Sequence, residues 1–486
     1  MTSPRLGGPV AAVVAVFTIS RLAAYASGVR FDASPLLTYA WHTIDRDLLR
    51  HRLLESLFYL HSQPPGFNAM LGAALKAFPD RPEVALHAVY VVFGLVHAIA
   101  LLLVLYRAVG LGRWTSAAVT SVLSVSPAWI TYENWLFYDY PAAALLTLSA
   151  LLLFGFVDRR GWVAGLAFFA VVASLIATRA VFTPLWLVLV VGLLLLVCRD
   201  LRGRVLLTCT VAVAATAFLV GKNIVLFGVP STSSWAGMNL AEVAFSQVPP
   251  DERRELVAQG AISKISLIEP FGWPGEYLGI VPRPRPRGVP LLYRLGTEAE
   301  PNLHSEIMVG ASKQYFRDAV RLIRLRPEAY ATAVALSLGL YARPSSDLVY
   351  VADNRFRLGV FARAYDRVVL LQTKPGEPSW TIVLGHTLAL LYGLWLTTRL
   401  LLRRAPPTAR AVLLAYVWLT LAYATVLIGL VQISENQRLR FLVDTFAVIL
   451  VAAAFRDAVA WTRNRRARQS EGAAHAGGAG DEIPCT

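Results

Sequence analysis

Residues 8–26, GPVAAVVAVFTISRLAAYA, form the first of the apolar runs that decide the fold of this chain. A helix of about twenty mostly apolar residues is long enough to cross a hydrocarbon core of about 30 Å. Further runs follow at residues 83–106, 114–131, 139–157, 161–177, 180–198, 205–227, 379–402, 410–431 and 441–461. The sequence therefore predicts an all-α polytopic membrane protein with about ten transmembrane helices.

The composition and the charge pattern support this prediction. Of the 486 residues, 56% are hydrophobic and 16% charged, whereas a soluble domain carries about 25% charged residues. The arginines gather in clusters at Arg107/Arg113, Arg159/Arg160, Arg199/Arg202/Arg204, Arg399/Arg403/Arg404/Arg410 and Arg463/Arg465/Arg466/Arg468. All clusters fall on one side if ten segments cross in order, and the positive-inside rule makes that side cytoplasmic. The net charge of +15 thus reflects topology, and we expect no nucleic-acid partner.

Four regions follow from this topology. Residues 1–227 form an N-terminal transmembrane module whose first outer loop spans 27–82, with short juxtamembrane helices in 34–60. Residues 228–378 form a mixed outer-face region that includes a basic amphipathic helix at 303–326. Residues 379–462 hold the C-terminal transmembrane helices, and 463–486 form a disordered cytoplasmic tail. We expect a multi-pass protein of a bacterial inner membrane, in contact with membrane lipids, whose site faces away from the cytoplasm.

Asp32 follows the first apolar run and is expected at the outer membrane surface. As a general base it would take a proton from an acceptor hydroxyl, and its negative charge would stabilise positive charge developing at a sugar carbon. The alternative is a solvated loop carboxylate or a helix cap. His61 and Gln63 precede a rigid Pro64-Pro65 turn that could aim both side chains outward or simply begin a helix.

Glu133 and Asp139 lie in the next short outer connection, at the expected membrane level of Asp32. Two carboxylates there could orient a sugar or hold a divalent cation, Mg²⁺ or Mn²⁺. The alternative is interfacial, because Trp and Tyr anchor helix ends at this level while acidic side chains simply face water.

Four basic residues and one amide are candidates for binding an anionic substrate. Arg179 lies in an outer turn, and Lys222 and Asn223 lie in the outer end of an apolar run, where a lysine must be paired, snorkelling or functional. Arg438 and Arg440 open the last apolar run on the side where arginine is disfavoured. A guanidinium there could clamp a phosphate, or pair with Glu435.

This pattern resembles the GT-C superfamily of membrane glycosyltransferases, close to its family-39-like bacterial members and similar to protein mannosyltransferases and aminoarabinose transferases. The resemblance rests on Asp32, the Pro64-Pro65 turn, the acidic stretch from Glu133 to Asp139, and the arginine-bearing loop from Glu435 to Arg440.

The resemblance implies inverting sugar transfer from a polyprenyl-phosphate donor to an envelope glycan, glycolipid or protein. Asp32 would be the base, Glu133 or Asp139 the second acid, and Arg179, Lys222, Arg438 or Arg440 the phosphate ligands. The sequence departs from this resemblance at one position. Many members of the family pair the first-loop aspartate with an adjacent acidic residue, whereas here Asp32 is followed by Ala33.

Two other classes were weighed on the same residues. A glycan polymerase or ligase also uses outer-loop arginines and lipid-linked substrates. A flippase or transporter should carry charge near the bilayer midplane or paired broken helices. The middles of the predicted segments are almost free of charge, and the polar residues gather at the outer boundary, which favours interfacial chemistry.

Overall fold

The computed structural model describes residues 6–37, 42–284, 287–402 and 407–477. Helices make up the architecture of these residues, and pairing between extended segments is limited to isolated β-bridges. The predicted all-helical class agrees with this architecture. Residues 38–41, within the stretch 34–60 for which short juxtamembrane helices are predicted, lie outside the described residues.

Six helices in the described residues are long and apolar enough to cross a membrane by length and composition. They are α1 (Gly7–Ala26), α6 (Pro82–Leu103) with its continuation η1 (Val104–Val109), α9 (Asp139–Arg159), α12 (Arg202–Phe227), α19 (Trp380–Leu402) and α20 (Ala409–Val431). Many of their large apolar side chains are exposed, such as Leu22, Leu207 and Leu384. Exposed apolar surface of this extent suits contact with lipid, in agreement with a membrane protein.

The predicted number of ten spans is not confirmed. The run at 114–131 is divided into α7 (Arg113–Ser124) and α8 (Pro127–Glu133), because Ser126 accepts a hydrogen bond from the Trp129 amide and Pro127 begins a new helix. Two other runs give the short apolar helices α10 (Trp162–Thr178) and α11 (Pro184–Val197). The last run lies within α21 (Asn436–Gly477), which remains helical where a disordered tail was expected from residue 463.

Helix α9 lies inside the bundle and packs against α6, α10, α20 and α21. Its first turn carries Asp139, Tyr140 and Pro141, all buried. Because neighbouring helices surround this helix, side chains at its N-terminal end meet residues from distant parts of the sequence. This arrangement places the loop that contains Glu133 and Asp139 at the centre of the molecule.

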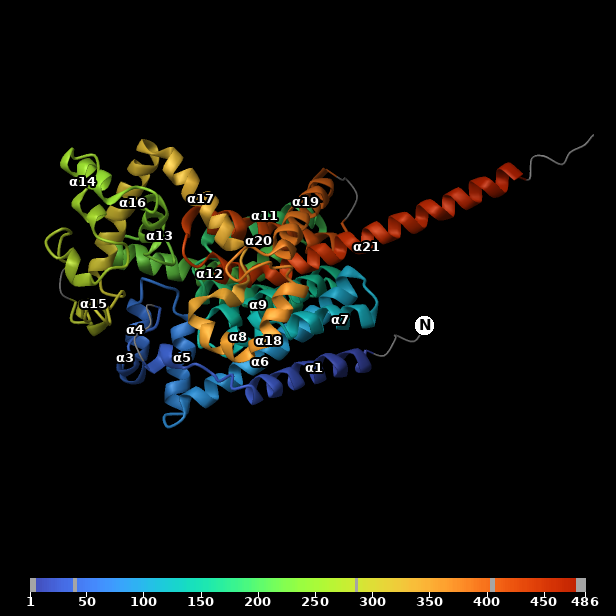
Figure 1. Cartoon of the computed structure of the whole chain (residues 1–486), viewed down its shortest axis with the longest axis horizontal. Helices are drawn as coiled ribbons and strands as arrows, with labels where there is room; N and C mark the ends of the chain where they lie inside the picture. The colour runs from blue at the N-terminus through green and yellow to red at the C-terminus, as the bar shows by residue number, and fades with distance from the viewer. Residues whose placement is uncertain (1–5, 38–41, 285–286, 403–406, 478–486) are drawn as a thin grey trace, which may run out of the picture.

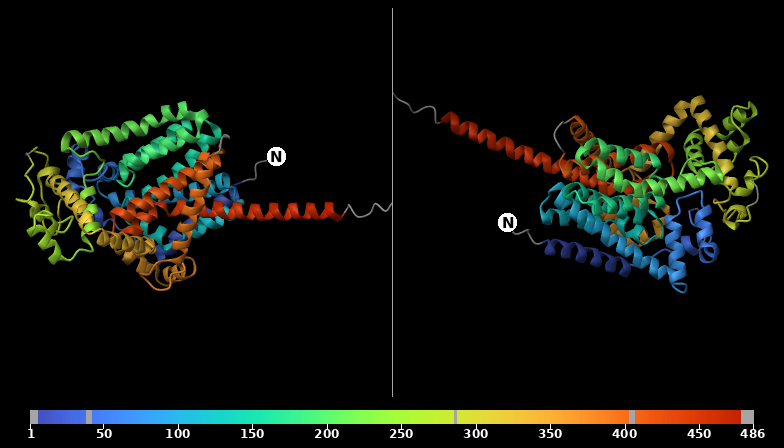
Figure 2. Two further views of the ribbon diagram at one scale, coloured as in Figure 1. Left: turned by 90° about the horizontal axis from the view of Figure 1, so that it is seen from above. Right: turned by 180° about the vertical axis from the view of Figure 1, so that it is seen from behind.

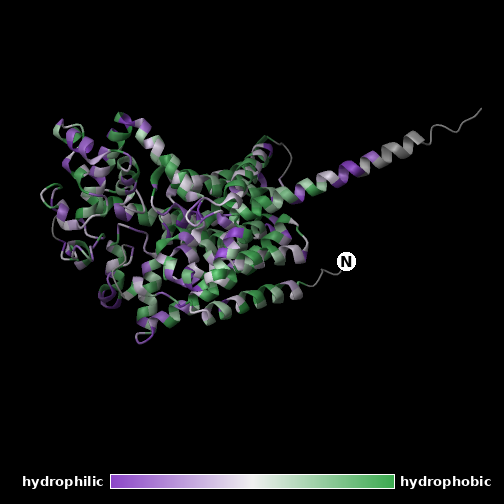
Figure 3. Ribbon diagram, in the orientation of Figure 1, coloured by the Kyte–Doolittle hydropathy of each residue, from purple (hydrophilic) through white to green (hydrophobic). Residues whose placement is uncertain are grey.

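The polar loop regions gather at one end of the bundle, which we call the loop end. Figure 1 shows there the first-loop helices α3 (Arg46–His51) and α4 (Leu53–Tyr59) beside α13 (Ala236–Phe245), α14 (Pro250–Ala258), α15 (Pro290–Tyr293) and α16 (Ile307–Leu325). The amino-terminal end of α1 and the far end of α21 lie at the opposite end in both views of Figure 2. Purple, hydrophilic residues are frequent at the loop end in Figure 3.

The remaining short helices join the loop end to the bundle. They are α2 (Ser34–Leu37), α5 (Gly66–Ala77), α17 (Pro327–Tyr341) and α18 (Ala352–Val368), with several 3₁₀ turns. The predicted amphipathic helix at 303–326 corresponds to α16, which packs closely on α13. That packing requires Gly237, because a Cβ there would lie 1.9 Å from the Ser312 carbonyl oxygen. The close approach fixes α13, which carries part of the site.

Candidate functional site

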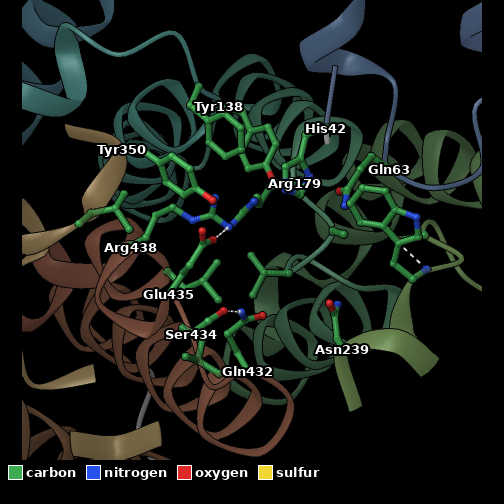
Figure 4. A pocket seen from close by; sticks show the side chains of 18 of the residues that line it. His42, Gln63, Tyr138, Arg179, Asn239, Tyr350, Gln432, Ser434, Glu435 and Arg438 are labelled. Atoms are coloured by element: carbon green, nitrogen blue, oxygen red, sulfur yellow. Dashed lines mark hydrogen bonds and ion pairs between the residues drawn. The ribbon is translucent and has the colours of Figure 1, made fainter. Parts of the chain in front are cut away.

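A cavity of about 930 Å³ lies between the loop end and the helical bundle. Its polar and charged wall residues come from segments far apart in the chain and include Asp32, Ser34, His42, Gln63, Tyr138, Arg179, Thr183, Ser231, Ser233, Asn239, Glu242, Asp347, Tyr350, Gln432, Ser434, Glu435, Gln437 and Arg438. Figure 4 shows lining side chains arranged around the opening and labels ten of them. Of the residues predicted from the sequence, Asp32, Gln63, Arg179 and Arg438 line this cavity.

Asp32 is fixed in the cavity wall through its backbone. Its amide donates to the Asn134 carbonyl at 2.8 Å, and its carbonyl accepts from the Leu136 amide at 2.9 Å. One carboxylate oxygen, Oδ1, accepts a hydrogen bond from the Ser34 amide at 2.9 Å. Among the described residues Oδ2 has no hydrogen-bond partner. The Asp32 side chain thus accepts a local hydrogen bond at the start of α2 (Ser34–Leu37) while the residue lines the cavity.

Arg179 and Arg438 converge on the buried Asp139. Arg179 Nη2 lies 3.2 Å from Asp139 Oδ1, and Arg438 Nε lies 3.6 Å from Asp139 Oδ2. Asp139 is completely buried, and both arginines are at least nine-tenths buried. Asp139 thus stands behind the cavity wall and holds two guanidinium groups that line it. We call these three residues the arginine clamp.

Neighbouring side chains orient the two guanidinium groups. The Arg179 guanidinium lies over the Tyr138 ring at 4.2 Å and that of Arg438 over the Phe137 ring at 5.0 Å. Arg438 Nη2 also pairs with Glu435 Oε2 at 2.6 Å, as Figure 4 shows. Stacked, ion-paired guanidinium groups at a cavity surface are the arrangement that suits a phosphate group.

His61 does not line the cavity but ties the first loop to the loop-end helices. Its Nδ1 lies 2.8 Å from Ser234 Oγ, and its Nε2 lies 2.9 Å from the His304 carbonyl oxygen. His304 in turn bonds Ser62 Oγ at 2.6 Å and the Thr43 carbonyl at 2.9 Å. Every one of these side chains is buried. This network fixes the turn that aims Gln63 into the cavity.

Lowering the pH is expected to destabilise the fold through this network. Burial lowers the pKa of His61 to about 3 and that of His304 to about 4, against about 6.5 in an unfolded chain. The two neutral histidines contribute fully to the free energy of unfolding above about pH 6.5. This contribution is lost as the pH falls toward their folded-state pKa values, by up to about 1.4 kcal/mol per pH unit for each histidine. The thermal midpoint of His304→Gln should decline less steeply than that of the wild type between about pH 7 and pH 4.5. Parallel declines would contradict this assignment.

Lys222, Asn223 and Arg440 also lie away from the cavity wall. Lys222 Nζ donates to the Leu60 carbonyl, and Asn223 Nδ2 donates to the Ser231 carbonyl at 2.8 Å. Arg440 is almost completely buried. Its guanidinium pairs with Asp444 at 2.8 Å and donates to the Arg343 carbonyl at 2.6 Å. In this structure these three residues secure backbone turns around the site.

Glu133 does not line the cavity; its carboxylate instead contacts Arg21 of α1. Its Oε2 lies 2.8 Å from Arg21 Nη2 and accepts a hydrogen bond from the Tyr140 hydroxyl at 2.7 Å. The Glu133 side chain is completely buried, and that of Arg21 is 12% exposed. The contact joins α1 to the ends of α8 and α9.

Replacing Arg21 by methionine should destabilise the fold. The substitution leaves the Glu133 carboxylate buried without its cation, and breaking a buried ion pair costs about 3 kcal/mol. The double variant Arg21→Met/Glu133→Gln removes both charges and should recover most of the loss. Unfolding of the purified variants in detergent measures the effect. Equal stability of the single variant and the wild type would show that the pair is not a structural contact.

The acidic residues suggested for a divalent cation do not fit one. Glu133 is paired with Arg21, and Asp139 with Arg179 and Arg438. A cation at either carboxylate would have to displace an arginine. Among the described residues no three His, Cys, Asp or Glu side chains come together in a group suited to a metal ion. We therefore derive no step through a metal.

Several residues of the site were not predicted from the sequence. Glu242 and Tyr350 line the cavity, and His304 holds the His61 turn. Glu242 follows Asn239 by three residues on α13, a spacing that places both on one helix face. That spacing was a usable signal, but Tyr350 and His304 are brought in only by the tertiary fold.

Comparison with known proteins adds no relative: no protein-family model, curated protein or solved structure matches the chain.

Proposed function

We propose that the protein is a membrane glycosyltransferase of the GT-C type that moves a sugar from a polyprenyl-phosphate donor to a hydroxyl acceptor. The observation that carries this proposal is the shared cavity: Asp32, whose Oδ2 has no hydrogen-bond partner among the described residues, lines the same space as two arginines anchored on a buried carboxylate. A base for the acceptor and cations for the leaving phosphate are the groups that such a transfer requires.

In the proposed reaction Asp32 takes the proton of the acceptor hydroxyl as its oxygen attacks the anomeric carbon of the donor sugar. The new glycosidic bond forms as the bond from that carbon to the phosphate oxygen breaks. Polyprenyl phosphate leaves with the bonding electron pair, and Arg179 and Arg438 stabilise its negative charge. A single displacement inverts the configuration of the sugar.

The arginine clamp is suited to this task because its two guanidinium groups are held in position before the donor binds. Asp139 and the Tyr138 and Phe137 rings hold the two guanidinium groups in place. Preorganised cations need little reorganisation as charge develops on the leaving group. The end of α20 adds apolar wall residues, Leu427, Ile428 and Val431, which suit the first isoprene units of a lipid donor.

The donor assignment is tested by comparing two ligands that differ only in the phosphate. Radiolabelled undecaprenyl phosphate and undecaprenol are titrated onto the purified full-length protein in nanodiscs. Bidentate contacts from two arginines should make the phosphate form bind at least about tenfold more tightly. Equal affinities would contradict a phosphate site in this cavity.

A further inference from the structure

A second polar wall lies across the cavity from the arginine clamp. It consists of Gln63, Asn239 and Glu242, with Trp235 beside them, and we call it the amide wall. In Figure 4 the Gln63 and Asn239 side chains border the opening on the side away from Arg438. Trp235, Asn239 and Glu242 are spaced four and three residues apart at the start of and along α13, and so share one face of that helix.

Within the part of the chain that the structure describes, the polar side-chain groups of the amide wall are not used by the fold. Among the described residues, the side chains of Gln63, Asn239 and Glu242 form no hydrogen bond or ion pair. Gln63 is only 8% exposed, yet it lines the cavity. A buried amide without a protein partner loses about 1 to 3 kcal/mol unless water or a ligand satisfies it. These three side chains therefore present donors and acceptors to whatever enters the cavity, water or ligand.

The chemistry of the wall suits a sugar. Amides both donate and accept, as vicinal hydroxyls do, and a carboxylate accepts from hydroxyls. Trp235 supports the wall from behind: only 2% of the residue is exposed, its ring packs on His42 and Phe271 at 5.1 and 5.2 Å, and its indole nitrogen donates to the Leu303 carbonyl at 3.3 Å. Polar groups that fix orientation beside an aromatic surface are typical of small-molecule sites.

The charge of the wall favours a neutral ligand. Burial raises the pKa of Glu242 to about 7, with the negative charges of Glu435 and Glu269 acting in the same direction. Near neutral pH the carboxyl group is therefore partly protonated and can donate as well as accept. Arg438 acts on the pKa of Glu242 in the opposite direction. A ligand anion beside Glu242 and Glu435 would be repelled by whichever of them is ionised, whereas hydroxyl groups would find matching donors and acceptors.

We propose that the amide wall is the acceptor subsite and that it takes a neutral glycoside, so that the acceptor is a glycan rather than a protein side chain. This inference rests on the proposed function, because it assigns the two walls of one cavity to the two substrates. The donor phosphate lies at the arginine clamp, and the acceptor sugar lies against α13.

The test uses saturation-transfer NMR on the purified full-length protein in nanodiscs. The probes are the methyl glycosides of glucose, galactose, mannose and N-acetylglucosamine. The wild type should transfer saturation to the ring protons of at least one glycoside. Asn239→Ala and Glu242→Ala should each weaken that binding by about tenfold, because each removes a hydrogen-bonding group. Glu255→Ala is the matched control, since Glu255 is an exposed carboxylate of α14 outside the cavity wall.

The same samples separate this inference from the donor assignment. Undecaprenyl phosphate should bind Glu242→Ala and Asn239→Ala as it binds the wild type. Wild type that binds undecaprenyl phosphate but none of the glycosides would overturn the acceptor subsite and leave the donor site standing. Glycoside binding that is unchanged in both variants would also overturn it. Glycoside binding lost in the variants, with no phosphate preference in any sample, would support the subsite and overturn the donor assignment.

Discussion

Asp32→Asn is expected to lower the turnover number for sugar transfer by about 10²- to 10⁴-fold, the usual contribution of a general base. Asparagine keeps the size of the side chain, and its amide oxygen can still accept from the Ser34 amide. The backbone bonds of Asp32 to Asn134 and Leu136 involve no side-chain atoms. The variant should therefore fold, bind the donor with unchanged affinity, and fail only in the proton transfer.

The matched control for this variant is Asp47→Asn, because Asp47 is a first-loop carboxylate with 67% of its side chain exposed and lies outside the cavity wall. Its turnover should equal that of the wild type. Turnover and the donor and acceptor Michaelis constants are measured for all three proteins with one lipid-linked donor. Asp32→Asn that retains more than about a tenth of the wild-type turnover would remove Asp32 from the role of base.

Arg438→Gln is expected to weaken the binding of undecaprenyl phosphate by about 100-fold, because two charge-assisted hydrogen bonds are lost. Arg438→Lys keeps the positive charge beside Asp139 but loses the planar fork, so a smaller loss of about tenfold is expected. The affinity for undecaprenol, which has no phosphate, should be unchanged in both variants. Titration of the two ligands onto the purified proteins measures the difference.

Two controls accompany this prediction. Arg294→Gln removes an exposed arginine of the loop end and should leave both affinities unchanged. Unfolding of each variant in detergent is measured beside the affinities, so that loss of binding is separated from loss of stability. An Arg438→Lys variant that binds undecaprenyl phosphate like the wild type would show that the fork geometry is not used.

The helical class and part of the site could be predicted from the sequence, because the signals are local. Apolar runs about twenty residues long predict helices from composition alone. Asp32, Arg179 and Arg438 were chosen because each follows or precedes such a run, and the structure brings all three to one cavity. Position relative to a span is thus informative when a site lies at the ends of helices.

Pairing between distant residues could not be predicted in the same way. Glu133 and Asp139 were equivalent as sequence, yet Glu133 pairs with Arg21 while Asp139 anchors Arg179 and Arg438. Lys222 was a candidate phosphate ligand, but its ammonium group meets the Leu60 carbonyl. Each of these outcomes depends on how helices far apart in the chain pack together, and no periodicity within a single helix encodes that.

The predicted number of ten spans is not confirmed, and residues 114–131 show one local reason. Hydropathy over residues 114–131 is continuous enough for one helix, but the Ser126–Pro127 step ends α7 and begins α8. Such a break matters for the site, because α8 leads directly to the stretch from Glu133 to Asp139. A local cap thus positions the loop that supports the arginine clamp.

The most direct test of the account is transfer of radiolabelled sugar from a panel of decaprenyl- and undecaprenyl-phosphate sugars to envelope glycans by the purified protein. We expect the wild type to transfer label from at least one donor with inversion of the anomeric configuration, and Asp32→Asn to transfer it at least about 100-fold more slowly. Folded wild type that transfers label from no donor, or equal transfer by wild type and Asp32→Asn, would contradict it.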